Sequence, residues 1–135
     1  MRMGRPLVTS VAEVMTRQVV YLPEATMLDE AAQVMRDRSI GDVVVTRGPT
    51  MIGVVTDRDI VVRAIAEDLP PKTTSLGEIT SHELIMVEQS ATVDEAVQAM
   101  RERNVRRLLV CDADRKVVGI LSLSDVALLP SSTAA

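Results

Sequence analysis

An internal repeat limits the fold of this chain more than any other feature of its 135 residues. The run DEAAQVMRDR at 29–38 recurs as DEAVQAMRER at 94–103, which is an offset of 65 residues. The run GVVTDRDI at 53–60 recurs as GILSLSDV at 119–126 with an offset of 66, so the second copy has one additional residue between these runs. Two copies of so long a period predict a duplicated domain rather than a solenoid.

The repeat also sets the predicted domain boundaries. Residues 11–67 form the first copy, and residues 76–129 form the second. The linker between them, 68–75, contains a pair of prolines and a polar run, as connecting segments often do. Residues 1–10 form an N-terminal segment without the apolar core of a signal peptide. We expect the small and polar tail at 130–135 to fray.

Both copies predict the same order of elements, which is strand, helix, strand, strand, helix. Apolar residues spaced by three and four predict an amphipathic helix after the first strand, and two β-rich runs joined by a turn predict a hairpin after that helix. The last helix of each copy begins near Asp57 or Ser124. The predicted strands are 19–22, 43–46 and 52–55 in the first copy, and 84–87, 108–111 and 117–121 in the second. The fold class is therefore α+β, a mixed fold of two tandem βαββα units.

Two cap signals mark the starts of the amphipathic helices. Thr92 with Glu95 forms a capping box in the second copy. Thr26 with Asp29 is a looser version of the same signal in the first copy. We therefore expect both helices to begin at a side-chain cap.

Charge and composition argue against several classes of function. The chain has 15 Lys and Arg against 19 Asp and Glu, and its net charge of -4 does not give the basic footprint that nucleic-acid binding needs. Cys111 and His82 are each single, so neither a disulfide framework nor a metal site is expected. No apolar run approaches the roughly 20 residues of a membrane span. We therefore expect a cytoplasmic protein that contacts neither nucleic acid nor membrane.

The residue types also argue against an enzyme. The sequence has no Cys–His pair, no Ser-His-Asp set and no phosphate loop of the Walker type. His82 beside Glu83 could serve as a lone general base, but a histidine at the surface or at the edge of a cleft is the simpler interpretation. No catalytic residue is therefore predicted.

A hydroxyl and a carboxylate recur at matched positions of the two copies. The first copy has Thr56 and Asp59, the second has Ser122 and Asp125, and each pair follows a glycine in the preceding strand. An Asp fixed at a helix start can accept two hydrogen bonds from the vicinal diol of a ribose, as in dinucleotide folds. The hydroxyl can donate to a phosphate or to the sugar. The same spacing is also that of a helix N-cap, so the pattern leaves both interpretations open.

These residues resemble the CBS domain family, whose tandem pairs are known as Bateman modules. The resemblance extends from AEVMT at 12–16 through the Asp-Glu-Ala helix to TDRDI at 56–60, and then through the whole second copy. It implies βαββα units that pair through their sheets as one pseudo-twofold CBS pair, with two clefts between the copies. It also implies an adenosyl ligand, which would be AMP, ADP, ATP or S-adenosylmethionine, and no obligatory cofactor.

The resemblance assigns ligand roles to residues of both copies. It implies that the Thr or Ser and the Asp of each pair hold phosphate and ribose, and that apolar residues beside the first strand and at the hairpin hold the adenine. The expected first site comprises Thr56, Asp59, Val19, Val20, Ile40 and Val54. The expected second site comprises Ser122, Asp125, Leu84, Ile85, Val105 and Ile120.

A difference in charge before the hairpin predicts that the two sites are unequal. In the family, a basic residue at this place often faces the phosphates. The second copy has Arg106 and Arg107 there, whereas the first has Gly41 and Asp42. Arginine suits phosphate recognition and an aspartate would repel it. The sequence does not assign the two arginines to one of the two sites, and a surface role for Arg107 remains the alternative.

The function predicted from these residues is that of a non-enzymatic sensor. It would bind an adenosyl ligand, form a homodimer and signal to a separate, unknown effector protein, because no output domain accompanies the repeats. The alternative is a structural or interaction dimer with empty or vestigial sites. Asp42 favours that alternative, as does the scarcity of aromatic side chains, since Tyr21 is the only one.

Overall fold

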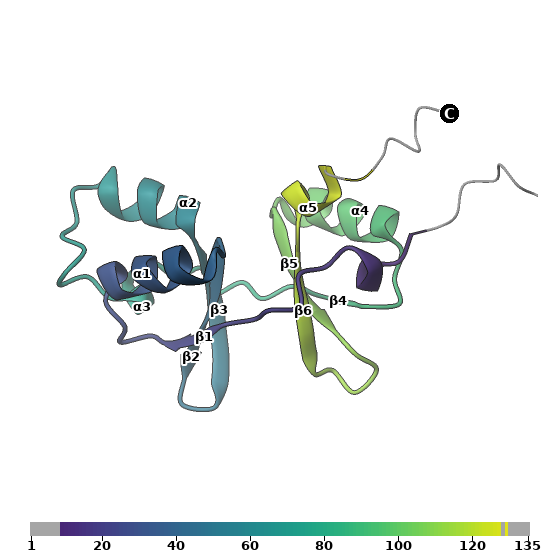
Figure 1. The fold of residues 1–135 in the computed structure, drawn as a ribbon, viewed down its shortest axis with the longest axis horizontal. Coiled ribbons are helices and arrows are strands. Elements are labelled where there is room, and N and C mark those ends of the chain that lie inside the picture. The colour runs from purple at the N-terminus through teal and green to yellow at the C-terminus, as the bar shows by residue number, and fades with distance from the viewer. Residues whose placement is uncertain (1–8, 128, 130–135) are drawn as a thin grey trace, which may run out of the picture. The chain divides into compact units, whose positions relative to one another are not determined.

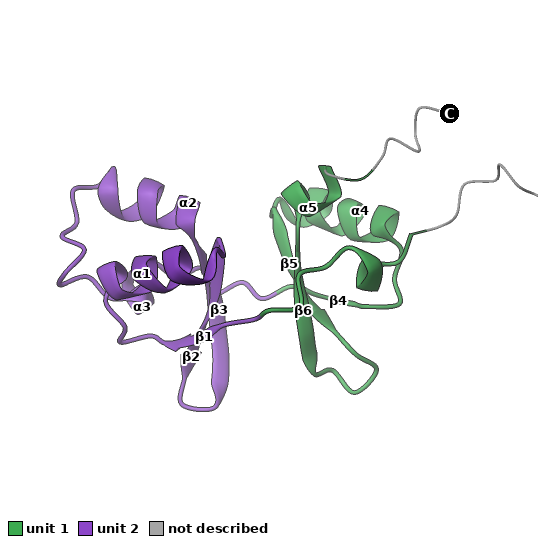
Figure 2. Ribbon diagram, viewed as in Figure 1, with its two compact units in different colours: residues 1–18, 85–135 green, residues 19–84 purple. Residues whose placement is uncertain are grey.

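The chain divides into two compact units, and their composition differs from the sequence repeats. The computed structural model describes residues 9–127 and 129 (Figure 1), so the expectation that the tail frays lies outside the described residues. Unit 1 comprises residues 1–18 and 85–135, and unit 2 comprises residues 19–84 (Figure 2). Each unit therefore combines most of one repeat with the opening segment of the other.

Unit 2 contains a three-stranded sheet and the helices that cover one of its faces (Figure 1). Strand β1 is parallel to β2, and β2 is antiparallel to β3, in the sheet order β1-β2-β3. The elements are β1 (Tyr21–Pro23), α1 (Leu28–Arg38), β2 (Asp42–Arg47), β3 (Thr50–Thr56), α2 (Asp57–Asp59), the π-helix η2 (Ile60–Ile65) and α3 (Leu76–Ile79).

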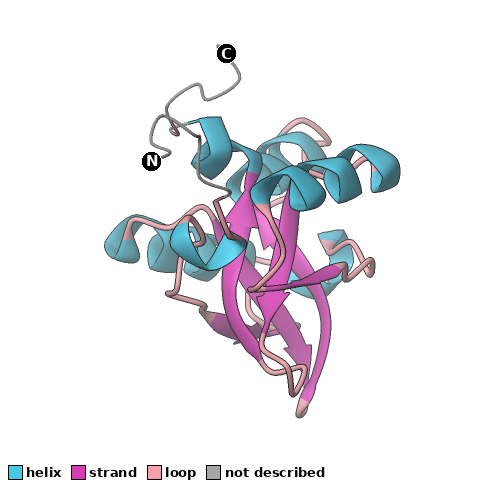
Figure 3. Ribbon diagram, turned by 90° about the vertical axis from the view of Figure 1, so that its right-hand side faces the viewer, coloured by secondary structure: helices cyan, strands magenta, loops and turns pink. Residues whose placement is uncertain are grey.

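Unit 1 repeats this plan with a sheet in the order β4-β5-β6. Strand β4 is parallel to β5, and β5 is antiparallel to β6. Figure 3 shows the strands and helices from a second direction. The elements are the 3₁₀ helix η1 (Val11–Glu13), β4 (Met86–Glu88), α4 (Val93–Arg103), β5 (Arg107–Cys111), β6 (Val117–Ser122) and α5 (Leu123–Ala127).

The structure confirms the α+β class and the βαββα order in both copies, with one shift at the first strands. The predicted strands at 19–22 and 84–87 are observed as β1 and β4, which begin two residues later. The residues before them still pair with the sheet, because Val44 donates its N–H to Val20 O at 2.8 Å and Leu109 donates to Ile85 O at 2.9 Å. The apolar runs therefore identify the pairing segments, and only part of each run has strand geometry.

A separate hydrophobic core lies between sheet and helices in each unit. Residues of α1, β2, β3, η2 and α3 meet in unit 2, and residues of η1, α4, β5 and β6 meet in unit 1. The buried members in unit 2 are Leu28, Ala31, Met35, Val43, Val45, Val55, Ala64, Leu76 and Ile79. Those in unit 1 are Val11, Met15, Ala96, Met100, Leu108, Val110 and Leu121. Among the helices of the described part, none combines the length and apolar character needed to cross a membrane.

The short helices η1 and α3 were not predicted, although the sequence carries a signal for them. Each opens with Ser-x-x-Glu, the pattern of a capping box. Ser10 donates its backbone N–H to Glu13 Oε2 at 2.8 Å, and Ser75 donates in the same way to Glu78 at 2.7 Å. Both helices contribute buried apolar side chains to a core, so they are parts of the folded units rather than linkers.

The predicted cap at Thr92 is confirmed, and the predicted cap at Thr26 is wrong. Thr92 and Glu95 exchange hydrogen bonds of 2.8 and 3.0 Å at the start of α4. Helix α1 instead has Met27 as its N-cap residue, without a side-chain cap bond. Because the repeat offset of 65 pairs Met27 with Thr92, the Thr26 motif lies one residue too early.

Replacing these two N-cap residues should move stability in opposite directions. We expect Thr92→Ala to lower the free energy of unfolding by about 1 kcal/mol, because the Glu95 N–H loses its acceptor. Met27→Thr should raise it by up to about 1 kcal/mol, because the Met27 backbone, with φ -74° and ψ 153°, matches that of Thr92, with φ -78° and ψ 155°. Urea unfolding of the variants measures both effects, and a destabilised Met27→Thr protein would contradict the matched cap geometry.

Candidate functional site

Thr56 and Asp59 form a closed hydrogen-bonded pair at the end of β3. The Thr56 N–H donates to Asp59 Oδ2 at 2.9 Å, and the Asp59 N–H donates to Thr56 Oγ1 at 2.9 Å. Thr56 has the extended backbone of an N-cap residue, with φ -107° and ψ 165°, and α2 begins directly after it. The strand thus ends at the hydroxyl, and the first helical turn fixes the carboxylate beside it.

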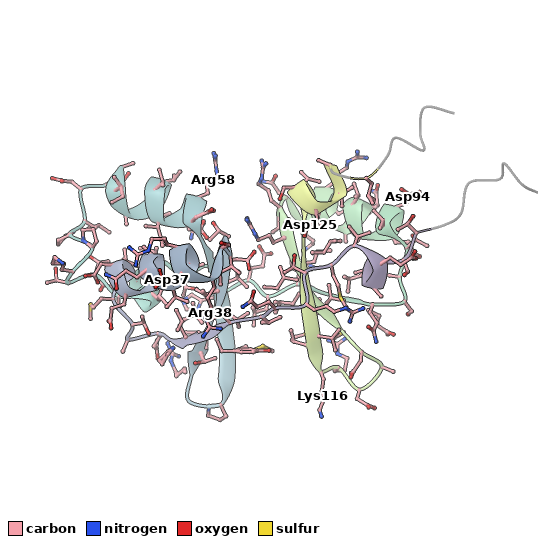
Figure 4. All side chains as sticks on the ribbon, viewed as in Figure 1. Asp37, Arg38, Arg58, Asp94, Lys116 and Asp125 are labelled. Atoms are coloured by element: carbon pink, nitrogen blue, oxygen red, sulfur yellow. The ribbon has the colours of Figure 1, made fainter. Side chains whose placement is uncertain are left out.

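Ser122 and Asp125 repeat this arrangement at the end of β6. The Ser122 N–H donates to Asp125 Oδ2 at 3.0 Å, and the Asp125 N–H donates to Ser122 Oγ at 3.2 Å. A further hydrogen bond of 2.8 Å joins the hydroxyls of Ser122 and Ser124, which the first copy lacks because Arg58 occupies the matched position. Figure 4 shows Arg58 on α2 and Asp125 on α5.

These bonds show that both pairs are reciprocal helix caps, which was one of the two interpretations of the motif. The cap geometry does not use all of their hydrogen-bonding capacity. A hydroxyl that accepts a backbone N–H retains its own hydrogen for donation, and a carboxylate offers a second oxygen. Each cap thus places a hydroxyl beside a carboxylate, a pair in which the carboxylate can accept from a ribose hydroxyl and the hydroxyl can donate to a phosphate oxygen.

A neighbouring segment of chain closes over the glycine that precedes each pair. A Cβ atom added at Gly53 would collide with the Ser81 carbonyl oxygen and lie 2.5 Å from Thr80 Oγ1. At Gly119, a Cβ would lie 2.8 Å from the Thr16 carbonyl oxygen and 2.7 Å from Met15 Sδ. The observed role of these glycines is therefore close packing of backbone on backbone.

The same segments extend each sheet beyond its third strand. Ser81 forms an isolated bridge with Val54, and Thr16 exchanges two hydrogen bonds of 2.9 Å with Ile120. Residues 80–81 and 15–16 therefore border the strands that lead to the two pairs. These residues were not predicted to border a site, although they follow the Ser-x-x-Glu helices at matched positions.

Apart from Leu84, each predicted adenine neighbour belongs to the same unit as its hydroxyl–carboxylate pair. Val19, Val20, Ile40 and Val54 belong to unit 2 with Thr56 and Asp59, and Ile85, Val105 and Ile120 belong to unit 1 with Ser122 and Asp125. Leu84, predicted for the second site, is the last residue of unit 2. Val20 and Ile40 pack against the core of unit 2, and Ile85 and Val105 pack against that of unit 1, so these four have a structural role as well.

The two arginines lie in unit 1, next to the Ser122–Asp125 pair. Arg107 is the cross-strand partner of Ser122, and Arg106 O accepts the N–H of Leu123 at 2.9 Å. In unit 2, Asp42 is the cross-strand partner of Thr56, and Gly41 O accepts the N–H of Asp57 at 2.9 Å. The difference in charge noted in the sequence thus falls directly beside the two hydroxyls.

Arg63 is a further charged residue at the first pair. Its Nε atom lies 3.8 Å from Asp59 Oδ1, and its Nη1 donates to the Ile79 carbonyl at 3.1 Å. The i,i+4 spacing of an acid and a base was the available signal in the sequence. Within the part of the chain that is described, no group of three or more His, Cys, Asp or Glu side chains is placed to hold a metal ion.

Comparison with known proteins gives two matches to one family. The CBS domain model matches residues 11–65 and 76–131. The chain is 32% identical over 120 residues to Hypoxic response protein 1 of Mycobacterium tuberculosis, which covers 88% of this chain and 83% of that protein. It is 34% identical over 118 residues to the uncharacterized protein MK0525 of Methanopyrus kandleri, and this match covers 87% of this chain but only 60% of MK0525.

Solved structures have the same fold. The crystal structure of Hypoxic Response Protein I with two coordinated zinc ions superposes with a TM-score of 0.66 at 32% identity, covering 88% of this chain and 97% of that one. The CBS domain pair of protein MJ0100, solved with 5′-methylthioadenosine and S-adenosyl-L-methionine, superposes with a TM-score of 0.74 at 22% identity, covering 90% of this chain and 94% of that one.

Adding a methyl group at the close approach should destabilise the protein. We expect Gly53→Ala to lower the free energy of unfolding by about 2–3 kcal/mol, because the Ser81 carbonyl is backbone and cannot rotate away. The control is Gly48→Asn in the hairpin turn, where φ is 60° and no atom lies within 4 Å of the added Cβ. Asn tolerates this conformation, so the control should change stability by less than about 0.5 kcal/mol. Equal stability of the two variants in urea unfolding would contradict the observed packing.

Proposed function

The chain belongs to the CBS domain family, and from this premise we propose that it is a non-enzymatic regulatory module that binds an adenosyl ligand. Occupancy would be transmitted to a separate effector protein. The observation that carries the proposal is the hydroxyl–carboxylate pair, which both units hold in the same reciprocal geometry at the end of a hairpin.

The composition of the candidate sites supports a nucleoside held by hydrogen bonds and aliphatic contact. Tyr21 is the only aromatic residue of the chain, and it belongs to neither pair. A base would therefore pack against valine and isoleucine rather than stack on a ring. The complex of MJ0100 with 5′-methylthioadenosine and S-adenosyl-L-methionine supports the adenosyl class for this fold. AMP, ADP, ATP and S-adenosylmethionine are accordingly the proposed ligands.

The proposed sites differ in their preference for phosphate. Arg106 and Arg107 adjoin the Ser122–Asp125 pair, whereas Gly41 and Asp42 hold the same places in unit 2. A guanidinium group donates two parallel hydrogen bonds to a phosphate, and a carboxylate cannot donate any when ionised. We therefore assign the stronger binding of phosphorylated ligands to the Ser122–Asp125 pair in unit 1.

Regulation then follows from a difference in affinity between two conformations of the module. A ligand shifts such an equilibrium only by as much as it binds one state better than the other. Couplings of about 1–3 kcal/mol are typical and suffice to change the occupancy of an effector severalfold. The module needs no chemistry of its own for this function.

Isothermal titration of the purified protein with each ligand tests the proposal. We expect Asp125→Asn to weaken AMP binding roughly tenfold to a hundredfold, because the diol loses a charge-assisted acceptor. The amide oxygen still accepts the Ser122 N–H, so the cap and the fold are retained. Asp59→Asn is the matched variant and should have a smaller effect on AMP than on adenosine.

The two variants together separate the possible outcomes. Equal losses of AMP affinity in both would refute the assignment of phosphate to unit 1. Absence of heat with any ligand, from folded protein shown to be free of co-purified nucleotide, would refute ligand binding. It would leave the second candidate function, an interaction module whose hydroxyl–carboxylate pairs act only as helix caps.

Exposed apolar residues on η2 favour self-association as part of either function. Val61, Val62 and Ile65 are 57%, 46% and 54% exposed. An apolar group of this kind on one short helix is typical of an interaction surface. We propose that η2 forms part of a homodimer interface.

Light scattering tests the proposed dimer. We expect the native chain to have the mass of two copies, and the double variant V61E/I65E to have the mass of one, because glutamates would be buried at the interface. Tyr21→Ser removes another exposed apolar side chain, 45% exposed on β1, and should leave the dimer intact. A monomeric native protein, or a dimeric V61E/I65E variant, would contradict the assignment to η2.

A further inference from the structure

Asp59 is linked to α3 by one arginine side chain. Arg63 Nε lies 3.8 Å from Asp59 Oδ1, and the same guanidinium donates through Nη1 to the Ile79 carbonyl at 3.1 Å. Ile79 is the last residue of α3 and directly precedes Thr80 and Ser81, which close over Gly53. Arg63 therefore joins the carboxylate of the candidate site to the segment that borders it.

The carboxylate is held through both of its oxygens by different partners. Oδ2 accepts the Thr56 N–H at 2.9 Å, and Oδ1 faces the guanidinium of Arg63. The hydrogen bond and the longer ion pair both restrict the rotation of the carboxylate plane about the Cβ–Cγ bond. The side chain of Asp59 is 23% exposed and that of Arg63 is 50% exposed, so both remain within reach of a ligand.

The second copy has no arginine at the position that matches Arg63. With the repeat offset of 66, Leu129 occupies the position matched to Arg63. The residues that precede Asp125 include Ser122 and Ser124, whose hydroxyls form a hydrogen bond of 2.8 Å with each other. The two carboxylates thus have the same backbone contacts and different side-chain support.

The π-helix η2 positions the Arg63 side chain between Asp59 and α3. Backbone hydrogen bonds span five residues here, as from Ala66 N to Val61 O at 2.9 Å, and η2 follows α2 without a break. Short π-helical segments are rare and occur often at functional sites. Arg63 on this segment reaches Asp59 on one side and α3 on the other.

We propose that Arg63 is a positioning residue, which orients the Asp59 carboxylate so that it accepts both hydroxyls of a ribose at the unit 2 site. This inference rests on the proposed function of that site. Without Arg63 the Thr56 N–H still holds Oδ2, but Oδ1 loses its ion pair. The carboxylate plane is then less restricted, so that the diol loses part of its hydrogen bonding while the rest of the nucleoside keeps its contacts. The effect is specific to unit 2, since Leu129 cannot support Asp125 in this way.

The test compares the binding of adenosine with that of 2′-deoxyadenosine in the Asp125→Asn variant. Binding at the unit 1 site is weakened in this variant, so the measured affinity is that of the unit 2 site. The ratio of the two dissociation constants measures how well the carboxylate reads the diol. We expect Arg63→Met to reduce this ratio about threefold to fivefold, the range of a partly exposed ion pair, with little change for 2′-deoxyadenosine. Arg63→Lys retains the charge but not the two-pronged contact and should give an intermediate ratio.

Arg58→Met is the matched control. It removes the same charge from the adjacent helical turn, and no contact of the Arg58 side chain with Asp59 is observed among the described residues. The ratio should stay at its native value in this variant. Equal weakening of both nucleosides by Arg63→Met would leave the ratio unchanged and would mean that Arg63 is only structural. Unchanged binding of both nucleosides would mean that Arg63 does not orient Asp59.

A second measurement tests the link between Arg63 and Asp59 in the free protein and does not depend on whether a nucleoside binds. The Arg63 Nε–H signal in the NMR spectrum of the free protein should exchange slowly with solvent. Asp59→Asn should accelerate that exchange severalfold, since the ion pair is lost. Exchange as fast as that of Arg58 in the native protein would overturn the proposed link.

Discussion

Each compact unit depends on the close approach of a borrowed segment to a glycine in its third strand. Ser81 lies against Gly53, and Thr16 lies against Gly119, at distances that leave no room for a Cβ atom. The helix that delivers each segment also buries apolar side chains, such as Leu76 of α3 in unit 2 and Val11 of η1 in unit 1. The opening segment of one repeat is therefore needed to complete the unit formed by the other, and a single repeat lacks part of its core. Either repeat contains the whole βαββα order, but that order alone does not supply every buried residue of a unit.

Periodicity predicts this fold well because the strands and long helices bury one regular face. The order of elements and both hairpins follow from the apolar patterns alone. The short helices η1 and α3 were not predicted because three or four residues are too few to show helical periodicity. Their one signal in the sequence is the Ser-x-x-Glu capping box. The cap of α1 was placed one residue early because the repeat has Met27 where the second copy has Thr92. Membership of Leu84 in unit 2 could not be predicted either, because the exchange of segments is a tertiary event.

The sequence predicts the two hydroxyl–carboxylate pairs but not the side chains around them, such as Arg63 beside Asp59. Spacing alone identifies Thr56 with Asp59 and Ser122 with Asp125, but it leaves open whether they cap a helix or bind a ligand. The structure shows that the cap is formed in both units. Capping and binding are compatible, because the backbone contacts orient the same groups that a ribose would meet, at no additional entropic cost on binding. Under the proposed function, each cap would therefore hold the hydroxyl and the carboxylate in place for the ribose.

A duplication produces two copies with the same sequence, so the positions at which the copies now differ are informative. Core positions of α1 and α4 have kept their residue type, for example Ala31 with Ala96 and Met35 with Met100, since packing restricts them. Charge differs instead around the two hydroxyl–carboxylate pairs, where Asp42 matches Arg107 and Arg63 matches Leu129. Neither difference is needed by the core, because none of these four residues belongs to the buried clusters. If both pairs bind ligands as proposed, the two sites would share a scaffold and differ in local charge, so they would prefer different ligands.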